Sequence, residues 1–239
     1  MKEKIYNMVY EVEGSHWWYR VRRQLVKDLI SKYANKTTTI LDIGCGPGLL
    51  LSELQNNGRE IFGVDLSPIA LEFCKKRGLK NVSLADAGAL PFSDNTFDVV
   101  LLLDMLEHVQ DDSGVLREAR RVLKSEGIVI IFVPCFNFLW TKNDEISHHY
   151  RRYTLPELTN KISSNFTILR KTYFNFFLFP LIFLLTVVMN LLRVKLIAGK
   201  KLNNKITDSI WHVIFKQELS FLKFLSFPFG VSAFIVAKK

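Results

Sequence analysis

The sequence predicts an α/β fold built on a doubly wound parallel sheet. Between residues 38 and 134, five short apolar runs that suit buried strands alternate with runs of helical periodicity. One of them, residues 97–103, is apolar except for Asp98, which is typical of a strand covered by helices on both faces. Short strand–helix–strand steps produce parallel strands, because each helix carries the chain back across the sheet. At 239 residues the chain has room for one such domain and an added sub-domain.

The first predicted strand, residues 38–43, leads into a glycine-rich turn, and a helical pattern begins at Leu49. The turn contains three glycines: Gly44, Gly46 and Gly48. Glycine suits a turn pressed against a ligand, which requires a positive φ or leaves no room for a Cβ atom. The spacing is Gly-x-Gly-x-Gly rather than Gly-x-Gly-x-x-Gly, and Asp42 would repel a pyrophosphate. These features favour a ligand that carries an ammonium group over a dinucleotide.

Acidic residues follow the next two predicted strands. The chain continues as helix, strand, helix and strand over residues 49–57, 60–65, 68–77 and 81–85. Asp65 lies 23 residues after Asp42 (65 − 42), about where an acid at the tip of the second strand accepts ribose hydroxyls. The alternative is an acid that caps the next helix, but Ser67 and Pro68 already supply that cap. Asp86 stands in the same place after the third strand.

The fourth predicted strand, 97–103, leads into residues 104–109, which include His108. Open α/β sheets bind ligands at the carboxyl ends of their strands, so we expect His108 to face the cleft. Packing or a single hydrogen bond is the alternative role for this histidine. A helix over 111–123 has acids at its start and bases at its end, as the helix dipole favours, and a fifth strand follows at 127–133.

Four of these features resemble, in order and spacing, the motifs of the class I S-adenosylmethionine (SAM)-dependent methyltransferases, in particular the type 11-like group: residues 41–48, the acid at 65, residues 85–92 and residues 107–108. The resemblance implies a Rossmann-like seven-stranded sheet, with an antiparallel last strand inserted between the fifth and sixth. It implies a SAM-binding core over residues 38–134, with SAM as methyl donor and S-adenosylhomocysteine as product. The cofactor-binding residues that it implies are Asp42, Gly44, Gly46, Gly48, Asp65, Leu66, Asp86, Ala87 and Leu103.

Residues 14–34 have the periodicity of an amphipathic helix that precedes the first strand. Its aromatic and basic start, residues 15–23, resembles the N-terminal helix that many such methyltransferases fold over the cofactor as a lid. The alternative is that Trp17 and Trp18 only pack the helix on the sheet, which is the commoner role of buried aromatics.

Residues beyond 134 depart from the generic core, and we expect the acceptor side of the domain at 135–172 and 226–239. A polar and basic cluster at 148–153 precedes a helix capped by Thr154. Capping and packing are the alternative role for this cluster. Two adjacent histidines with no third ligand at metal spacing predict no metal site. We expect substrate contacts by Trp140, Tyr150 and Arg151, and proton transfer by His108, His148 or His149.

Residues 173–192 contain no charged side chain and are long enough to be considered as a membrane span. A span would separate the predicted sixth strand, 166–172, from the last strand, 231–237. We therefore expect an apolar helical insertion over 173–225, which lines a substrate pocket, is buried in a homodimer or lies on a membrane. The basic residues that follow the apolar run favour an anionic surface: Arg193, Lys195, Lys200, Lys201 and Lys205.

The composition narrows the classes of partner. A net charge of +9 and a pI near 9.4 suit nucleic acid, an anionic membrane or an acidic substrate. We expect no nucleic-acid partner, because the sequence lacks an aromatic–basic stacking platform. Three widely spaced cysteines suit reduced thiols, and the N-terminus has no apolar run of signal-peptide length. We therefore expect a cytoplasmic protein, which the basic charge allows to be peripheral at the inner face of the membrane.

The function that these features favour is SAM-dependent methyl transfer to a small-molecule or lipid-like acceptor. A non-catalytic SAM-binding or membrane-associated accessory protein is the alternative, because intact cofactor motifs indicate binding but not turnover. An NAD-dependent oxidoreductase is disfavoured by the glycine spacing and by Asp42.

Overall fold

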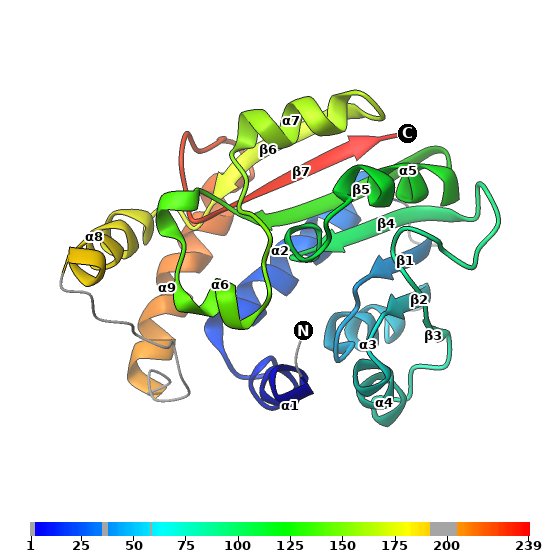
Figure 1. Ribbon diagram of the computed structural model, residues 1–239, viewed down its shortest axis with the longest axis horizontal. Coiled ribbons are helices and arrows are strands. Elements are labelled where there is room, and N and C mark those ends of the chain that lie inside the picture. Colours follow the sequence, from blue (N-terminus) through cyan, green and yellow to red (C-terminus); the bar gives the residue numbers. More distant parts are fainter. Residues whose placement is uncertain (1–2, 35–37, 58, 192–204) are drawn as a thin grey trace.

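The computed structural model of the chain describes residues 3–34, 38–57, 59–191 and 205–239. Seven strands form one sheet in the order β3-β2-β1-β4-β5-β7-β6 (Figure 1). Neighbouring strands are parallel except at β7, which pairs antiparallel with both β5 and β6. The predicted Rossmann-like sheet and the insertion of the last strand are confirmed. The strands are β1 Thr39–Ile43, β2 Glu60–Asp65, β3 Val82–Leu84, β4 Phe97–Leu103, β5 Leu123–Pro134, β6 Thr167–Phe174 and β7 Ser232–Lys238.

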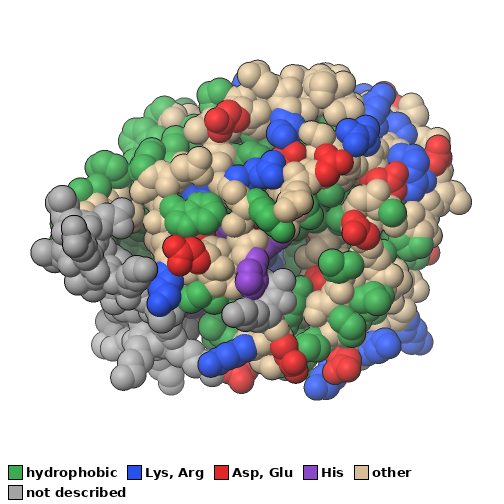
Figure 2. All heavy atoms as spheres, in the orientation of Figure 1, with side chains coloured by type: hydrophobic (Ala, Val, Ile, Leu, Met, Phe, Trp, Pro, Cys, Tyr) green, Lys and Arg blue, Asp and Glu red, His purple; other side chains and the backbone are tan. Residues whose placement is uncertain are grey.

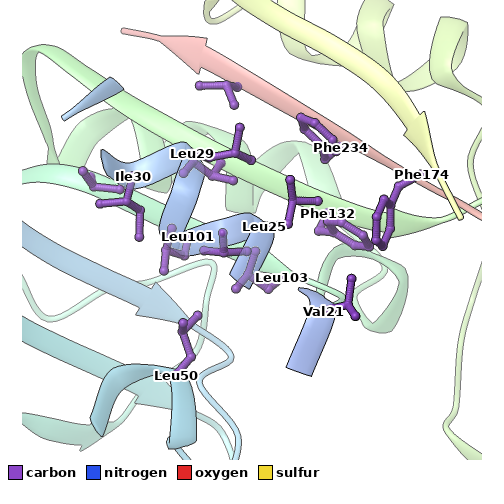
Figure 3. Packing of buried hydrophobic residues seen from close by; sticks show 14 of the residues in the cluster. Val21, Leu25, Leu29, Ile30, Leu50, Leu101, Leu103, Phe132, Phe174 and Phe234 are labelled. Carbon is purple, nitrogen blue, oxygen red and sulfur yellow. The ribbon is translucent and has the colours of Figure 1, made fainter. Parts of the chain in front are cut away.

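Helices cover both faces of the sheet, because alternate residues of each central strand point to opposite sides. On one face, α2 (Trp17–Tyr33), α3 (Leu49–Gln55) and α9 (Lys205–Leu222) pack on alternate residues of β4 and β5. Figure 3 shows this cluster, with Leu25 of α2 close to Leu103 and Phe132. The other face is covered by α5 (Asp112–Val122) and α7 (Leu155–Ser163).

The predicted N-terminal helix is α2, and most of its apolar face lies in the core. Trp17 stacks on Phe215 of α9, with ring centroids 4.6 Å apart, and Trp18 lies against Phe132 and Phe174. Both tryptophans thus pack against the core, while Trp18 and Arg22 also line the cavity described below, so the lid stays a prediction. A further helix, α1 (Glu3–Val12), packs on α4 (Pro68–Lys76) and has no counterpart in the sequence prediction.

The uncharged run 173–192 does not form one helical segment, so this part of the prediction is wrong at its start. Its first two residues, Tyr173 and Phe174, end β6 and pair with Ala233 and Ser232 of β7. An uncharged, apolar sequence is equally suited to a buried strand end and to a helix, and only the pairing distinguishes them. After a turn over residues 175–178, helix α8 (Phe179–Leu191) forms the rest of the described run. Arg193, Lys195, Lys200 and Lys201 lie outside the described residues.

Helix α8 leaves the body of the molecule at the edge near β6 (Figure 1). A buried glutamate on α9 holds the turn that starts it: Glu218 accepts hydrogen bonds from the backbone N–H of Phe176 at 3.0 Å and of Phe177 at 3.5 Å. Between β5 and α7 the chain forms the 3-10 helix η2 (Asn137–Leu139) and the short helix α6 (Lys142–Ile146). This connection and the end of β4 carry the polar residues discussed below.

Candidate active site

The glycine turn after β1 forms one wall of a cavity of about 430 Å³ at the carboxyl ends of the strands. Its three glycines have φ of 77°, 55° and 80°. A Cβ on Gly48 would lie 2.6 Å from the Cys74 sulfur, so this glycine is required by packing. Nothing lies within 4 Å of the Cβ position of Gly46, whose N–H donates to Asp65 Oδ2 at 2.9 Å. The turn thus presents open backbone to a cavity in the size range of small-molecule sites.

Most of the predicted cofactor residues are brought together by this cavity. Seven of them line it: Gly44, Gly46, Asp65, Leu66, Asp86, Ala87 and Leu103. Gly48 does not line it, and Asp42 lies beneath the turn with only 4% of its surface exposed. Asp86 is exposed, and its Oδ1 accepts a hydrogen bond from the Gly88 N–H at 2.8 Å.

Asp42 carries an unused acceptor. Its Oδ1 is buried and has no hydrogen-bond partner among the described residues. Burial raises the pKa of Asp42 from 3.8 to about 7, although Arg22 of α2 opposes that increase. The Arg22 guanidinium is already paired, because it forms an ion pair with Asp104 at the end of β4. A buried carboxylate without a partner fits a ligand with an ammonium group, as the aminoacyl end of SAM has.

Asp65 is held rigidly at the tip of β2. In addition to the bond from Gly46, its Oδ1 accepts hydrogen bonds from the Ser67 N–H at 2.9 Å and from the Tyr6 hydroxyl at 3.0 Å. Tyr6 belongs to α1, so this helix contacts the cavity through the acid that is predicted to bind a ribose. No feature of the sequence marked Tyr6 for this role.

A second cavity, of about 500 Å³, adjoins the first and shares Asp86, His108 and Val109 with it. The start of α5 and Tyr150 complete its lining. His108 therefore lies between a cavity that suits the cofactor and a cavity that is available to an acceptor. Burial, with a smaller contribution from His149, lowers the pKa of His108 from 6.5 to about 4.

His149 contacts His108 across the polar loop, with ring centroids 4.6 Å apart at an interplanar angle of 85°. Its Nδ1 lies 2.9 Å from Asp144 Oδ1, and Arg152 binds the same carboxylate through two contacts of 2.8 and 2.9 Å. Burial alone would raise the pKa of Asp144, but hydrogen bonds from His149 and Arg152 hold it well below its ordinary value. Asp144 is therefore a charged anchor that fixes one ring nitrogen of His149.

The other predicted acceptor residues surround this pair in different ways. Arg151 donates to Asp112 Oδ2 at 3.1 Å and to the Gln110 carbonyl at 2.8 Å, so it stabilises the start of α5. His148 is exposed and has a positive φ of 59°. Trp140 lies beside His149, with ring centroids 6.4 Å apart, and Tyr150 is 54% exposed at the second cavity.

The sequence analysis assigned no individual role to four charged residues of the site: Arg22, Asp104, Asp144 and Arg152. Arg22 lies within the aromatic and basic stretch 15–23, but nothing there distinguishes it from its neighbours. Asp144 had a detectable signal, because Thr141 and Asp144 form a capping box at the start of α6. Buried Glu107 precedes His108, and burial followed by repulsion from Asp104 raises its pKa well above the ordinary value.

Comparison with known proteins adds to this geometry. A family model described as "Methyltransferase domain" matches residues 41–131. The chain is 31% identical over 171 residues to a demethylmenaquinone methyltransferase of Staphylococcus aureus, covering 65% of this chain and 67% of that protein. It is 29% identical over 132 residues to a ubiquinone biosynthesis O-methyltransferase of Nitrosomonas europaea, covering 48% and 55%.

The fold has solved relatives. The crystal structure of a SAM-dependent methyltransferase from Archaeoglobus fulgidus superimposes with a TM-score of 0.57 at 23% identity, covering 91% of this chain and 94% of that one. The chain spans about half the length of the first curated relatives that it matches, 53% and 55%.

Proposed function

The chain belongs to the class I SAM-dependent methyltransferases, and on that premise we propose that it transfers a methyl group to a small, lipid-like acceptor. The observation that carries the proposal is the cleft itself. Its first cavity is lined by the glycine turn and Asp65, a second cavity adjoins it, and His108, with His149 against it, lines both. The quinone-related names of the two relatives above support an acceptor of this chemical class.

Bound SAM supplies a methyl group that its sulfonium already activates, so the protein mainly has to position the acceptor. Asp42 offers its unpartnered oxygen to the cofactor's ammonium group, and Asp65 offers acceptor lone pairs to the ribose hydroxyls. Helix α1 lines that end of the cleft and contacts Asp65 through the Tyr6 hydroxyl. We assign acceptor deprotonation to the His108–His149 pair, whose orientation is fixed by Asp144.

The apolar surface of α8 supports a lipid-like acceptor. Six of its side chains are between 38% and 58% exposed: Leu181, Phe183, Leu184, Leu185, Val187 and Val188. Figure 2 shows hydrophobic side chains grouped at the upper left of the molecule, the side where α8 lies in Figure 1. Phe138 of η2 contacts this surface, with its ring 5.6 Å from that of Phe183. The same η2–α6 connection leads to Asp144 and His149. We therefore propose that the head group of the acceptor binds at His108 and His149 and that its apolar tail lies on α8.

The direct test is transfer of label from [methyl-¹⁴C]SAM to hydroxylated naphthoquinol and benzenoid acceptors, each with and without a short prenyl tail. We expect label in the organic phase and a lower KM for the tailed acceptors, because their tails remove apolar area from water. Label in water-soluble acceptors alone would contradict the lipid-like class. Tight SAM binding without transfer to any acceptor would favour the accessory-protein alternative.

The affinity for SAM should rise with pH as Asp42 ionises. Because the folded-state pKa of about 7 lies above the ordinary 3.8, the folded protein holds this proton up to about pH 7. The free energy of unfolding therefore decreases as pH rises from 4 to 7. Ionising Asp42 in the folded, ligand-free protein costs roughly 4 kcal/mol more than ionising it in the unfolded chain. An ammonium group recovers part of that cost, so SAM should bind about tenfold more tightly at pH 8 than at pH 5.5.

Calorimetric titration at four pH values measures this effect, and Asp42→Asn should remove it. Glu13 lines the same cavity, and burial raises its pKa to about 7 as well, although Arg77 at 2.7 Å opposes that increase. Glu13→Gln is therefore the control, and it should keep the pH dependence. A dependence that persists in Asp42→Asn and disappears in Glu13→Gln would contradict the role of Asp42.

We also propose that α8 attaches the protein peripherally to an anionic bilayer, at the inner face of the membrane. Within the residues described, no helix is both long and apolar enough to cross a bilayer. The 13 residues of α8 extend for about 20 Å, whereas a hydrocarbon core is about 30 Å thick. A helix that is apolar all round and exposed is unstable in water, and the sequence that follows it is basic.

Co-sedimentation with phosphatidylglycerol vesicles should show binding that weakens at high salt, because salt screens the electrostatic part. Replacing Leu184 and Leu185 together with glutamate should reduce binding at least tenfold. Leu84→Glu is the matched control: Leu84 is 56% exposed on β3, at the opposite edge of the sheet. If the protein does not bind vesicles and is a dimer in solution, α8 belongs to a homodimer interface. If it does not bind vesicles and is a monomer, α8 belongs to the acceptor pocket.

A further inference from the structure

We propose that Glu107, His108 and His149 bind a divalent transition-metal cation. Each of the three offers one ligand atom, and these atoms all lie within 4.8 Å of one another. The sequence predicted no metal site, because His148 and His149 lack a third ligand nearby in the chain. The fold provides further ligands from a distant segment. The 3-10 helix η1 (Leu106–His108), after β4, brings a histidine and a glutamate to the loop that carries His149.

The imidazole of His149 is held by a carboxylate behind it. His149 uses Nδ1 for Asp144, at 2.9 Å, and so keeps Nε2 for the cluster. Ser147, on the loop that carries His149, lines the same cavity as the His108 ring. Metal-binding histidines usually donate one N–H to a carboxylate or carbonyl, which fixes the ring and leaves the other nitrogen unprotonated. Arg152 in turn fixes Asp144, so the support of the His149 ring is rigid.

Glu107 adds a third acceptor that nothing satisfies. Its carboxylate is buried, with 1% of the residue exposed, and its Oε2 has no hydrogen-bond partner in the described part of the chain. The two arginines nearest to the cluster are already paired, Arg22 with Asp104 and Arg152 with Asp144. A buried carboxyl oxygen and two ring nitrogens thus lie within 4.8 Å of one another, and a bound cation would displace the proton of Glu107 and satisfy all three.

The donor set selects the class of ion. Two imidazole nitrogens and one carboxylate oxygen suit Zn²⁺, Fe²⁺ or Mn²⁺, whereas Mg²⁺ and Ca²⁺ prefer oxygen ligands. Bonds of about 2.1 Å hold ligand atoms about 3–3.5 Å apart, so binding would draw the three groups together by about 1 Å. His108 lines both cavities, so remaining coordination positions would be reached from the acceptor side. On the proposed function, a cation there would bind an acceptor oxygen and lower its pKa, and the acceptor's proton would then pass to solvent, because the two histidines would hold the cation instead of taking the proton.

The test uses tag-free, full-length protein freed of metal with a chelator and titrated calorimetrically with ZnCl₂, CoCl₂ and MgCl₂. We expect one equivalent of Zn²⁺ or Co²⁺ to bind with a micromolar or lower Kd, and Mg²⁺ to bind at least a hundredfold more weakly. Bound Co²⁺ should give the visible absorption of a site with nitrogen ligands. This absorption reports on the folded wild-type protein, so the result does not depend on any variant being stable.

Glu107→Gln and His149→Ala should each weaken Zn²⁺ binding at least tenfold. His148→Ala is the matched control, because His148 is adjacent in sequence but outside the cluster, and it should bind Zn²⁺ within about twofold of wild type. No Zn²⁺ or Co²⁺ binding, or equal losses in His148→Ala and His149→Ala, would overturn the proposal. Titration of the metal-free protein with S-adenosylhomocysteine tests the proposed function separately. The cofactor residues lie outside the cluster, so the protein should bind S-adenosylhomocysteine even if it binds no metal.

Discussion

Replacing Asp65 with alanine should weaken SAM binding by about 1.5–3 kcal/mol, roughly 10- to 150-fold in Kd. Asp65 is 6% exposed at the tip of β2 and lines the first cavity, where we propose that its carboxylate accepts the ribose hydroxyls. The substitution also removes the acceptor for the Gly46 N–H, so the glycine turn loses a contact that shapes the cavity. Calorimetric titration with SAM and S-adenosylhomocysteine measures the change.

Tyr6→Phe is the control that separates the binding of SAM by Asp65 from the contact between Asp65 and α1. It removes only the hydroxyl that donates to Asp65 Oδ1 at 3.0 Å and leaves the ring in place against α4. We expect its SAM affinity to stay within about threefold of wild type, since the ribose can take the vacated lone pair. If Asp65→Ala bound SAM like wild type, or if Tyr6→Phe lost as much affinity as Asp65→Ala, the ribose assignment would be wrong.

His149→Ala should lower kcat for methyl transfer by about 10²- to 10³-fold, the usual range for a residue that handles a proton. Its ring is fixed by Asp144 and lies against His108, but it does not line the cofactor cavity. SAM affinity should therefore stay within about threefold, which distinguishes this variant from Asp65→Ala.

Steady-state kinetics with a responsive acceptor, together with SAM titration, checks both parts of the His149 prediction. Glu145→Ala is the matched control, because Glu145 is exposed on α6 in the same connection, and it should retain wild-type kcat. An unchanged kcat in His149→Ala would place proton transfer elsewhere and leave the loop with a structural role.

The core of the fold was predictable because local patterns and topology agree there. Strands β2 and β4 begin and end where alternation and apolar runs placed them, at Glu60–Asp65 and Phe97–Leu103. The cofactor cavity follows from the same logic, because glycine spacing and acids at strand ends mark a sheet edge without any knowledge of long-range contacts. Seven of the nine predicted cofactor residues line that cavity.

The parts that escaped prediction depend on contacts between distant segments. Tyr6 meets Asp65 only because α1 packs on α4, and no local pattern encodes that contact. His108 and His149 likewise meet only because the end of β4 lies against the loop after α6. Tyr173 and Phe174 are read as the start of an apolar helix until their pairing with β7 is known. Arg151 looked available for a substrate, but Asp112 already binds it.

The measurement that tests the central claim most directly is parallel titration of the purified protein with SAM, S-adenosylhomocysteine and NAD. The cleft built from the glycine turn, Asp42 and Asp65 should bind SAM and its demethylated product with one-to-one stoichiometry, and NAD should not compete. Binding of NAD in preference to SAM, or no binding of either SAM or S-adenosylhomocysteine, would contradict the assignment of this cleft and the methyl transfer proposed from it.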